Sequence, residues 1–323
     1  MLWLPTSPGE DSDAATDPAS ALHSAVMAVD HQALTRLVAP LRLKPGTKIA
    51  LPKGFDPAHK AGFASEADAG DALENSRRLL ADYQSKLAAQ NTYALLVVLQ
   101  ALDAGGKDGT VKHVMSGVNP AGVRVHSFKV PSVEELNHDY LWRYENALPE
   151  RGTIGIFNRS HYEEVLVVRV HPENLEREHL PPGARTRAVW ARRFREINDW
   201  ERYLVDNGIH IVKLFLNVSR DEQCRRLLAR IDEPSKNWKF SMADVEERRC
   251  WDDYQRAYSD VLTETSTEWA PWHVIPADHK WFARLASAAA IVEALRRIDP
   301  RYPTIDKAKR EELARARMEL DCS

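Results

Sequence analysis

The stretch LLVVLQALDAGGKDGT (Leu95–Thr110) decides the fold of this 323-residue chain. It opens with the unbroken apolar run Leu95–Leu99, which is typical of a strand buried on both faces of a parallel sheet. The run ends in a turn that holds Gly105 and Gly106, and Lys107 follows directly. Backbone N–H groups of such a turn and the start of a helix bind oxyanions, and a lysine reaches the outer phosphoryl group. The order strand, glycine turn, lysine therefore predicts a phosphate-binding loop.

Two positions depart from the general P-loop pattern. Ala101 stands where that pattern has its first glycine, and Asp108 stands where a Ser or Thr normally contacts Mg²⁺. Asp103, inside the loop, offers a carboxylate of the kind that Mg²⁺ prefers. The loop alone leaves an alternative open, an ordinary Gly-Gly turn between a strand and a helix with Lys107 in solvent.

The composition is that of an ordinary soluble protein, with 44% hydrophobic and 28% charged residues. No apolar run approaches the ~20 residues of a membrane span, and the N-terminus lacks the basic and apolar regions of a secretory signal. The three cysteines, Cys224, Cys250 and Cys322, have no metal-binding spacing. We therefore expect a cytoplasmic protein that does not associate with membranes.

The formal net charge of −3 offers no general attraction to nucleic acid. The arginines, however, are concentrated in two segments, residues 185–202 and 220–230. Local basic surface within a mildly acidic chain suggests one specific bound polyanion.

Strand and helix patterns alternate along the chain, which predicts a mostly parallel sheet with helices on both faces. The expected strands are 95–99, 123–128, 153–157, 209–217 and 272–275. The expected longer helices are 66–90, 187–205, 220–231, 242–262 and 280–298. Ligands of such a sheet bind at the carboxyl ends of its strands. We divide the chain into an N-terminal extension (1–35, expected to be partly disordered), one P-loop domain (36–300) and a C-terminal tail (301–323).

A second candidate site follows the strand 153–157. Enzymes with a P-loop commonly carry a carboxylate that orders Mg²⁺ at the end of a neighbouring strand. Here Asn158 holds that position, followed by Arg159, a candidate phosphate clamp. Glu163 could supply the missing carboxylate. Ser160 and Glu163 also match a helix capping box, so the residues alone leave both roles of Glu163 open.

The arginine-rich segment 185–202 resembles the lid of a P-loop kinase, which closes positive charge over the phosphates. The alternative is a solvated helix face with pairs four residues apart, such as Arg192 with Glu196.

Four blocks of sequence, in the same order, resemble the polyphosphate kinase 2 family. They are LDAGGKDGTVKHVMSGVNP (102–120), SFKVPSVEELNHDYLWR (127–143), IGIFNRSHYEEVLVVRVHP (154–172) and SKNWKFSMADVEERRCWDDYQRAY (235–258). The likeness runs from about residue 42 to residue 298. It implies a three-layer α/β fold of the P-loop, thymidylate-kinase-like type with a helical lid at about 180–205. It also implies Mg²⁺-dependent, reversible transfer of a phosphoryl group from inorganic polyphosphate to nucleotides.

The resemblance assigns roles to single residues. Asp103 and Lys107 fall on the family's metal-binding Asp and phosphate-binding Lys, and Arg159 falls on its Walker-B arginine. Much of the family has FDRS where this chain has Phe157-Asn158-Arg159-Ser160. Asn158 together with Glu163 resembles the branch that phosphorylates both AMP and ADP, which favours Glu163 as the second metal ligand.

The resulting expectations are as follows. The candidate catalytic residues are Asp103, Lys107, Arg159 and Glu163, and the candidate metal ligands are Asp103 and Glu163. The candidate nucleotide- and phosphate-binding residues are Ala104, Gly105, Gly106, Asp108, Gly109, Thr110, Arg143 and Asn158. The candidate polyphosphate and lid residues are Arg187, Arg192, Arg193 and Lys239. The expected cofactor is Mg²⁺, the expected partners are polyphosphate with AMP, ADP and ATP, and the resemblance implies a homo-oligomer.

Two other functions remain as alternatives to polyphosphate-dependent transfer. One is an ATP-dependent nucleotide kinase of the same fold. The other is a catalytically silent protein that binds polyphosphate or nucleotides, in which Asn158 marks lost metal binding.

Overall fold

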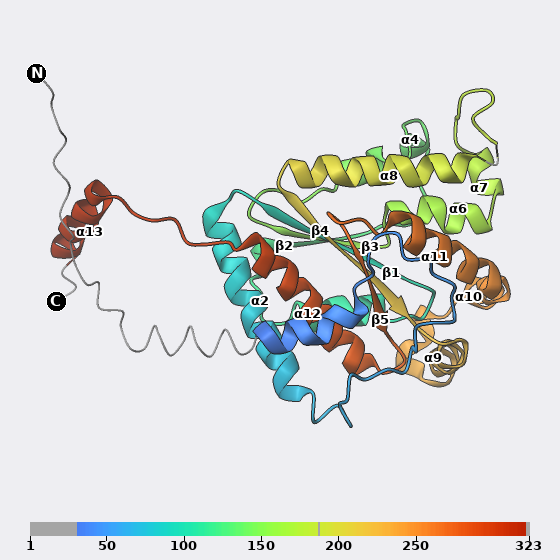
Figure 1. Ribbon diagram of the computed structural model, residues 1–323, viewed down its shortest axis with the longest axis horizontal. Helices are drawn as coiled ribbons and strands as arrows, with labels where there is room; N and C mark the ends of the chain where they lie inside the picture. The colour runs from blue at the N-terminus through green and yellow to red at the C-terminus, as the bar shows by residue number, and fades with distance from the viewer. Residues whose placement is uncertain (1–30, 187, 321–323) are drawn as a thin grey trace, which may run out of the picture.

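A five-stranded parallel sheet forms the centre of the computed structural model, which describes residues 31–186 and 188–320 (Figure 1). Its strand order is β2-β3-β1-β4-β5, and every neighbouring pair is parallel. The strands are β1 (Ala94–Ala101), β2 (Val123–Ser127), β3 (Ile154–Asn158), β4 (Ile209–Asn217) and β5 (Trp272–Pro276). The carboxyl ends of all described strands therefore meet at one edge of the sheet, as the alternating pattern predicted.

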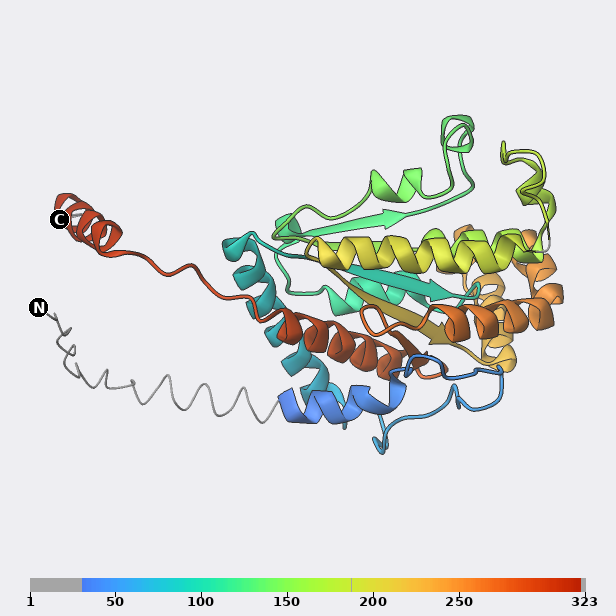
Figure 2. The ribbon, with the colours of Figure 1, turned by 45° about the horizontal axis from the view of Figure 1, so that its top comes forward.

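Two layers of helices cover the sheet, so the predicted three-layer α/β architecture is confirmed. On one face α12 (Lys280–Ile298) contacts α2 (Gly70–Gln90), α3 (Lys107–Val114), β4 and β5. On the other face α8 (Val189–Asp206) contacts β4 and α11 (Trp251–Thr265). Figure 2 shows the strands running between these two layers.

The shorter elements connect the layers or stand at the carboxyl edge. The α-helices among them are α4 (Val133–Leu136), α5 (Trp142–Glu145), α6 (Val167–Val170), α7 (Glu173–Glu176), α9 (Arg220–Asp232) and α10 (Met242–Glu247). The 3-10 turns are η1 (Ala39–Leu41), η2 (Pro120–Gly122), η3 (His161–Val165), η4 (Pro234–Lys239) and η5 (Arg248–Cys250).

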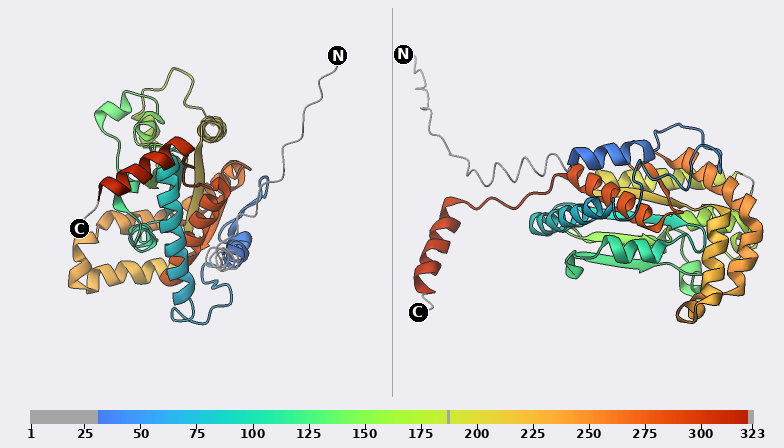
Figure 3. Two further views of the ribbon diagram at one scale, coloured as in Figure 1. Left: turned by 90° about the vertical axis from the view of Figure 1, so that its left-hand side faces the viewer. Right: turned by 90° about the horizontal axis from the view of Figure 1, so that it is seen from below.

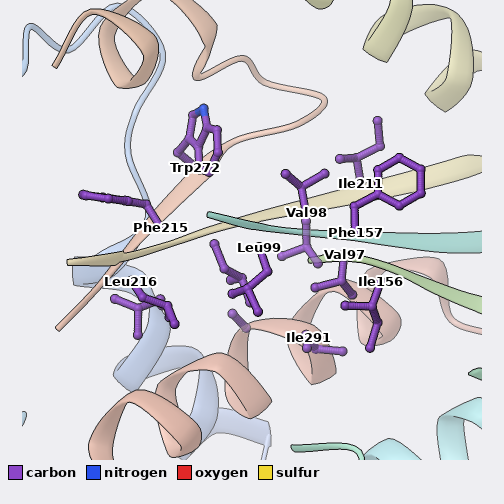
Figure 4. Close-up of a cluster of buried hydrophobic side chains, with 14 of the residues drawn as sticks. Val97, Val98, Leu99, Ile156, Phe157, Ile211, Phe215, Leu216, Trp272 and Ile291 are labelled. Carbon is purple, nitrogen blue, oxygen red and sulfur yellow. The ribbon is translucent and has the colours of Figure 1, made fainter. Parts of the chain in front are cut away.

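Burial of β1 on both faces makes it the axis of the core. All of its residues are buried, which confirms the interpretation of the Leu/Val run. Figure 4 shows Val97, Val98 and Leu99 between apolar side chains of the neighbouring strands and the helix layers, among them Phe157 and Ile291. At roughly 25 cal/mol per Å² of apolar surface, each fully buried side chain of this size contributes about 1.5–3 kcal/mol to folding.

One predicted helix is interrupted, and another segment forms two short helices. The segment after Pro131 forms α4 and α5, and Ser132 and Glu135 form a capping box at the start of α4. The segment 242–262 is divided into α10 and α11 by η5. At this break the Arg248 side chain donates to the carbonyl oxygen of Arg220 (2.8 Å) and to Gln223 (2.8 Å), both on α9.

One ion pair lies entirely inside the core. Lys213 of β4 and Glu201 of α8 are fully buried, with Nζ 2.6 Å from Oε2. The Lys213 ammonium also donates to the Tyr162 hydroxyl (2.8 Å) and the Thr265 carbonyl (2.7 Å). Because these bonds satisfy the ammonium, the pair fixes η3 and α11 against the sheet.

The last described helix, α13 (Lys307–Glu319), stands apart from the sheet and its layers (Figure 3). Every residue from Arg301 to Leu320 is exposed except Ala316, which is half-buried. The proposed N-terminal extension lies mostly outside the described residues, since description starts at residue 31 with a helical stretch that runs to residue 38. Among the described residues, none of the helices is long and apolar enough to cross a membrane.

Removal of the charge of the buried Glu201 carboxylate should lower the stability of the fold. In Glu201→Gln the Lys213 ammonium loses its counter-charge, so we expect the free energy of unfolding in urea to fall by at least about 3 kcal/mol. Arg202→Gln is the matched control, because the neighbouring Arg202 forms an exposed pair with Asp206. That change should cost less than about 1 kcal/mol. Equal effects of the two substitutions would contradict this role of the pair.

Candidate active site

The loop between β1 and α3 has the geometry of a phosphate-binding loop. It leaves the sheet at Leu102, and α3 begins at Lys107 with Gly106 as its N-cap. The N–H of Gly105 donates to the Leu102 carbonyl (3.0 Å), which closes the turn. The start of α3 therefore faces the carboxyl edge of the sheet, where helix N–H groups and the helix dipole favour an anion.

Both glycines of the loop are required by its shape. A Cβ on Gly105 would lie 2.6 Å from Cβ of Ala101 and 2.8 Å from the Leu102 oxygen, distances that real contacts do not show. Gly106 has a φ of 104°, in the region that side chains disfavour. Ala104 is also left-handed, with a φ of 57°. The glycine positions that predicted this loop are thus explained by close approach and by backbone conformation.

Lys107 points back across the loop. Its Nζ donates to the Ala101 carbonyl at 2.7 Å. Desolvation, together with the positive charge of Arg159, lowers the pKa of the Lys107 ammonium to about 8. The lysine is thus held at the loop with a charge that neighbouring protein groups only partly stabilise.

Arg159 brings the predicted catalytic residues together. It follows β3 with a φ of 64°, and its N–H donates to the Leu99 carbonyl (3.2 Å). Its guanidinium donates to Asp103 Oδ1 (2.8 Å) and to Glu163 Oε2 (3.1 Å). Left-handed backbone at a non-glycine residue is strained and gathers at functional sites. The two carboxylates raise the pKa of Arg159, Glu163 having the larger effect, so the guanidinium stays charged.

The contacts of Glu163 distinguish between a helix cap and a site carboxylate. Its carboxylate bonds to Arg159, and it lies in the 3-10 turn η3. The Ser160 hydroxyl accepts from the N–H of Tyr162 (3.3 Å) and from the Gln100 amide (3.0 Å). The reciprocal pattern of a capping box is not formed here, so the Glu163 carboxylate contacts Arg159 and does not act as a helix cap.

Asp108, which replaces the Ser or Thr of the P-loop pattern, and Asn158, which replaces the carboxylate expected after β3, contact each other. The Asn158 amide donates to Asp108 Oδ1 (2.7 Å) and to the Ser127 hydroxyl (3.3 Å). The carboxylate thus stands on α3, and the neutral partner stands at the end of β3. A carboxylate at position 158 would face Asp108 directly, and two like charges at that distance would repel.

A cavity of about 550 Å³ opens beside these residues. Asp103, Arg159 and Glu163 line one part of it. Much of the remaining wall is apolar and aromatic, and includes Phe128, Val130, Pro131, Leu136, Tyr144 and Val168. Charged side chains of both signs, among them Lys129, Arg177 and Asp244, complete the lining. The volume and the apolar part of the wall are typical of a pocket for a small organic ligand, and the charged part suits a ligand that also carries polar groups. The segments that carry α4 and α7 both contribute wall residues, and they stand out from the body in Figure 2.

The wall of this cavity holds a buried polar cluster that sequence reasoning missed. The Tyr144 hydroxyl donates to Glu164 Oε1 (2.9 Å), and burial raises the pKa of the Glu164 carboxyl to about 7. Arg193 donates to the Glu164 carbonyl (2.8 Å) and pairs closely with Glu178. Nothing in the spacing of these residues indicates the cluster, because they come together only through the packing of α5, η3 and α8.

The predicted lid and polyphosphate residues that the structure describes lie in three different environments. Arg193 is 1% exposed and holds Glu164 and Glu178, so the expectation of a mobile phosphate contact is corrected for this residue. Arg192 pairs with Glu196 (3.4 Å), which agrees with the alternative of a helix-face ion pair. Lys239 is exposed, 4.9 Å from the centre of the Trp238 ring. Arg187 lies outside the described residues.

The remaining predicted binding residues divide between the loop helix and the cavity. Thr110 is buried, and its N–H donates to the Gly106 carbonyl (2.9 Å); Gly109 is half-buried in the same helix turn. Arg143 lines the cavity, and its guanidinium contacts Glu135 (3.2 Å) and the Lys129 carbonyl (2.9 Å). Arg143 therefore stabilises the wall that carries α4.

The comparisons with known proteins show the family to which the chain belongs. The sequence profile of the family "Polyphosphate kinase 2 (PPK2)" matches residues 64–303. An ADP-polyphosphate phosphotransferase of Rhodopseudomonas palustris is 48% identical over 283 residues, which cover 86% of this chain and 96% of that protein. An AMP/ADP-polyphosphate phosphotransferase of Meiothermus ruber is 47% identical over 268 residues, covering 83% and 96%. The crystal structure of polyphosphate kinase 2 from Arthrobacter aurescens superposes with a TM-score of 0.75 at 42% identity, covering 85% of this chain and 94% of that one.

The lowered pKa of Lys107 predicts how anion binding depends on pH. An anion is attracted by the ammonium form, and the free protein loses that form as the pH rises through about 8. The affinity for inorganic tripolyphosphate, measured by calorimetry, should therefore fall between pH 7 and pH 9.5, by up to about tenfold per pH unit above 8. Lys107→Ala should abolish this dependence. A constant affinity of the unmodified protein across this range would contradict the assignment.

Proposed function

Since the chain belongs to the polyphosphate kinase 2 family, we propose that it transfers phosphoryl groups from inorganic polyphosphate to AMP and ADP, reversibly. The observation that carries the proposal is the meeting of two different binding features at one point. Asp103 belongs to the phosphate loop that ends at Lys107 and is joined through Arg159 to Glu163, and Asp103, Arg159 and Glu163 also line the cavity. The names of the relatives from Rhodopseudomonas palustris and Meiothermus ruber support the same donor and acceptors.

In this proposal the polyphosphate end lies on the loop, and the nucleoside of the acceptor lies in the cavity. The cavity volume of about 550 Å³ accommodates a nucleoside, and its apolar wall suits a base. The terminal phosphate of the acceptor then lies near Arg159, facing the donor. One P–O bond of polyphosphate breaks while a nucleotide phosphate oxygen forms the new one.

The chain's own residues act mainly through charge. Lys107 neutralises charge on the donor phosphates, and Arg159 orients and neutralises the group in transfer. The nucleophile, a nucleotide phosphate oxygen, is already ionised at neutral pH, so the reaction needs no strong general base. Preorganised positive charge is therefore the main contribution of the protein.

Mg²⁺ is the cofactor that we propose, with Asp103 and Glu163 as its protein ligands. Both carboxylates contact the same guanidinium, so they converge on one region, and both remain partly exposed to solvent. No group of three or more metal-binding side chains occurs among residues 31–186 and 188–320. This fits Mg²⁺, which is commonly held by one or two carboxylates together with substrate phosphates and water. When bound, the ion neutralises charge on the phosphates.

The proposal of both AMP and ADP as acceptors rests on Asn158 and Glu163. Glu163 supplies a carboxylate beside Arg159, while Asn158 bonds to Asp108 without adding charge. A homo-oligomeric assembly stays a prediction.

The first experiment measures ATP formed from AMP or from ADP, with Mg²⁺ and long-chain polyphosphate as the sole phosphoryl donor. ATP from both acceptors supports the proposal in full. ATP from ADP but not from AMP overturns the interpretation that Asn158 and Glu163 mark an enzyme that accepts both nucleotides. No product with polyphosphate but product with ATP as donor indicates an ATP-dependent nucleotide kinase, and binding without any product indicates a silent binding protein.

Asp103→Ala and Lys107→Ala should each lower kcat by at least about 10²-fold, because each residue acts on transition-state charge. Lys112→Ala is the matched control for Lys107, since Lys112 is exposed on the same helix. Its kcat should stay within about twofold of the unmodified enzyme. A near-normal kcat in Asp103→Ala or Lys107→Ala would count against the mechanism.

Asn158→Asp should change the preference between acceptors. The new carboxylate would face Asp108 and alter the charge beside the acceptor phosphate. We expect the ratio of kcat/KM for AMP to that for ADP to shift by at least about threefold, which corresponds to ~0.6 kcal/mol. An unchanged ratio would defeat this assignment.

A further inference from the structure

Arg226 of α9 is buried, at 8% exposure, and is bound almost entirely to backbone oxygens. Its Nη1 donates to the carbonyls of Ala104 (3.2 Å) and Gly105 (3.0 Å), both in the phosphate loop. Its Nη2 donates to the carbonyl of Ala277, at a short distance, and to that of Asp278 (3.3 Å). The fifth donor position, Nε, bonds to Glu222 (2.8 Å). Arg226 belongs to the basic segment 220–230, but its guanidinium is bound to other groups of the protein and is not left for a ligand.

The second pair of carbonyls is itself firmly placed. The N–H of Ala277 donates to the Asn217 carbonyl (2.9 Å) at the end of β4. The Asp278 carboxylate accepts from the N–H of Ser219 (2.7 Å), and the N–H of Asp278 donates to the Pro57 carbonyl (3.0 Å). Arg226 therefore connects the phosphate loop to a rigid junction that follows β4 and β5.

The orientation of the carbonyls determines that of the loop N–H groups. In a planar trans peptide the C=O of one residue and the N–H of the next point in opposite directions. The Ala104 carbonyl faces Arg226, and the N–H of Gly105 correspondingly bonds to Leu102 on the other side. By the same geometry, the Gly105 carbonyl on Arg226 turns the N–H of Gly106 away from α9.

We propose that Arg226 is a positioning residue for the phosphoryl donor. By holding the carbonyls of Ala104 and Gly105, its guanidinium keeps the N–H of Gly106 turned toward the donor phosphate. The planar fork of an arginine has five N–H donors and here reaches four carbonyls from two segments, whereas an ammonium group has three donors that radiate from one atom. The assignment rests on the proposed function in one respect, namely that the phosphate loop binds the donor.

The test compares Arg226→Lys and Arg226→Gln with Arg225→Gln. Arg225 is the matched control, because it neighbours Arg226, pairs with the same Glu222 and has a side chain that is 69% exposed. The KM for polyphosphate is measured at saturating ADP, and the KM for ADP at saturating polyphosphate. Amide hydrogen exchange of the segment 102–110 is followed in the ligand-free protein by mass spectrometry.

Both Arg226 variants should raise the KM for polyphosphate by at least about tenfold, or ~1.4 kcal/mol, with the KM for ADP within about twofold. Exchange in segment 102–110 should accelerate, while Arg225→Gln matches the unmodified protein in every measurement. An unchanged polyphosphate KM, a loss of kcat alone, or full rescue by Arg226→Lys would overturn the proposal. Full rescue by lysine would instead indicate a direct charge contact with the donor.

A second variant covers the case in which Arg226 substitutions do not fold. Glu222→Gln keeps the arginine but weakens its Nε partner. It should accelerate exchange in segment 102–110 and raise the polyphosphate KM by a smaller factor, and no change in either would overturn the proposal. The exchange measurement needs no turnover, so it tests the role of Arg226 even in an inactive enzyme. Inactivity of the unmodified enzyme with polyphosphate would refute the proposed function, independently of the exchange result.

Discussion

One guanidinium between two carboxylates organises the candidate active site. Asp103 comes from the loop after β1, Glu163 from the turn after β3, and each would repel the other without Arg159 between them. The backbone of Arg159 is strained, and the surrounding structure maintains it: its N–H is bound to β1, and the next residue, Ser160, is buried and bonded to Gln100. Strain of this kind persists only where neighbouring contacts over-determine the conformation. The position of both acids therefore depends on how β1 and β3 pair.

The molecule separates two kinds of charge. In the core, Lys213 and Glu201 neutralise each other without solvent, and their partners Tyr162 and Thr265 satisfy the remaining hydrogen-bonding capacity. At the carboxyl edge, desolvation lowers the pKa of the Lys107 ammonium. A bound phosphate would stabilise the charged form of this lysine. The buried Lys213–Glu201 pair holds the helices and strands around it in place. The charge of Lys107, which protein groups compensate only in part, is available to bind a ligand.

Sequence reasoning succeeded where a local pattern has a local physical cause. The Leu/Val run of β1, the strand 209–217 and the helix 280–298 were predicted at or close to their observed bounds, because burial periodicity and caps act over a few residues. Gly105, Lys107 and Arg159 were placed at the carboxyl edge because they follow strands of a parallel sheet, and the structure has them there; their roles stay predictions. The cluster of Tyr144, Glu164 and Arg193 and the connection through Arg226 could not be found in this way. Both depend on side chains from distant segments that meet only when the layers pack.

The path of the chain after β5 also has a consequence for handling the molecule. Because α12 starts at the carboxyl edge and runs back along the sheet, the exposed segment from Arg301 onward leaves at the amino edge (Figure 1). The candidate site and the C-terminal segment therefore lie at opposite ends of the sheet. A fusion partner or a solid support joined beyond α13 would be held by a tether of exposed residues. It would leave the phosphate loop and its cavity facing the solution.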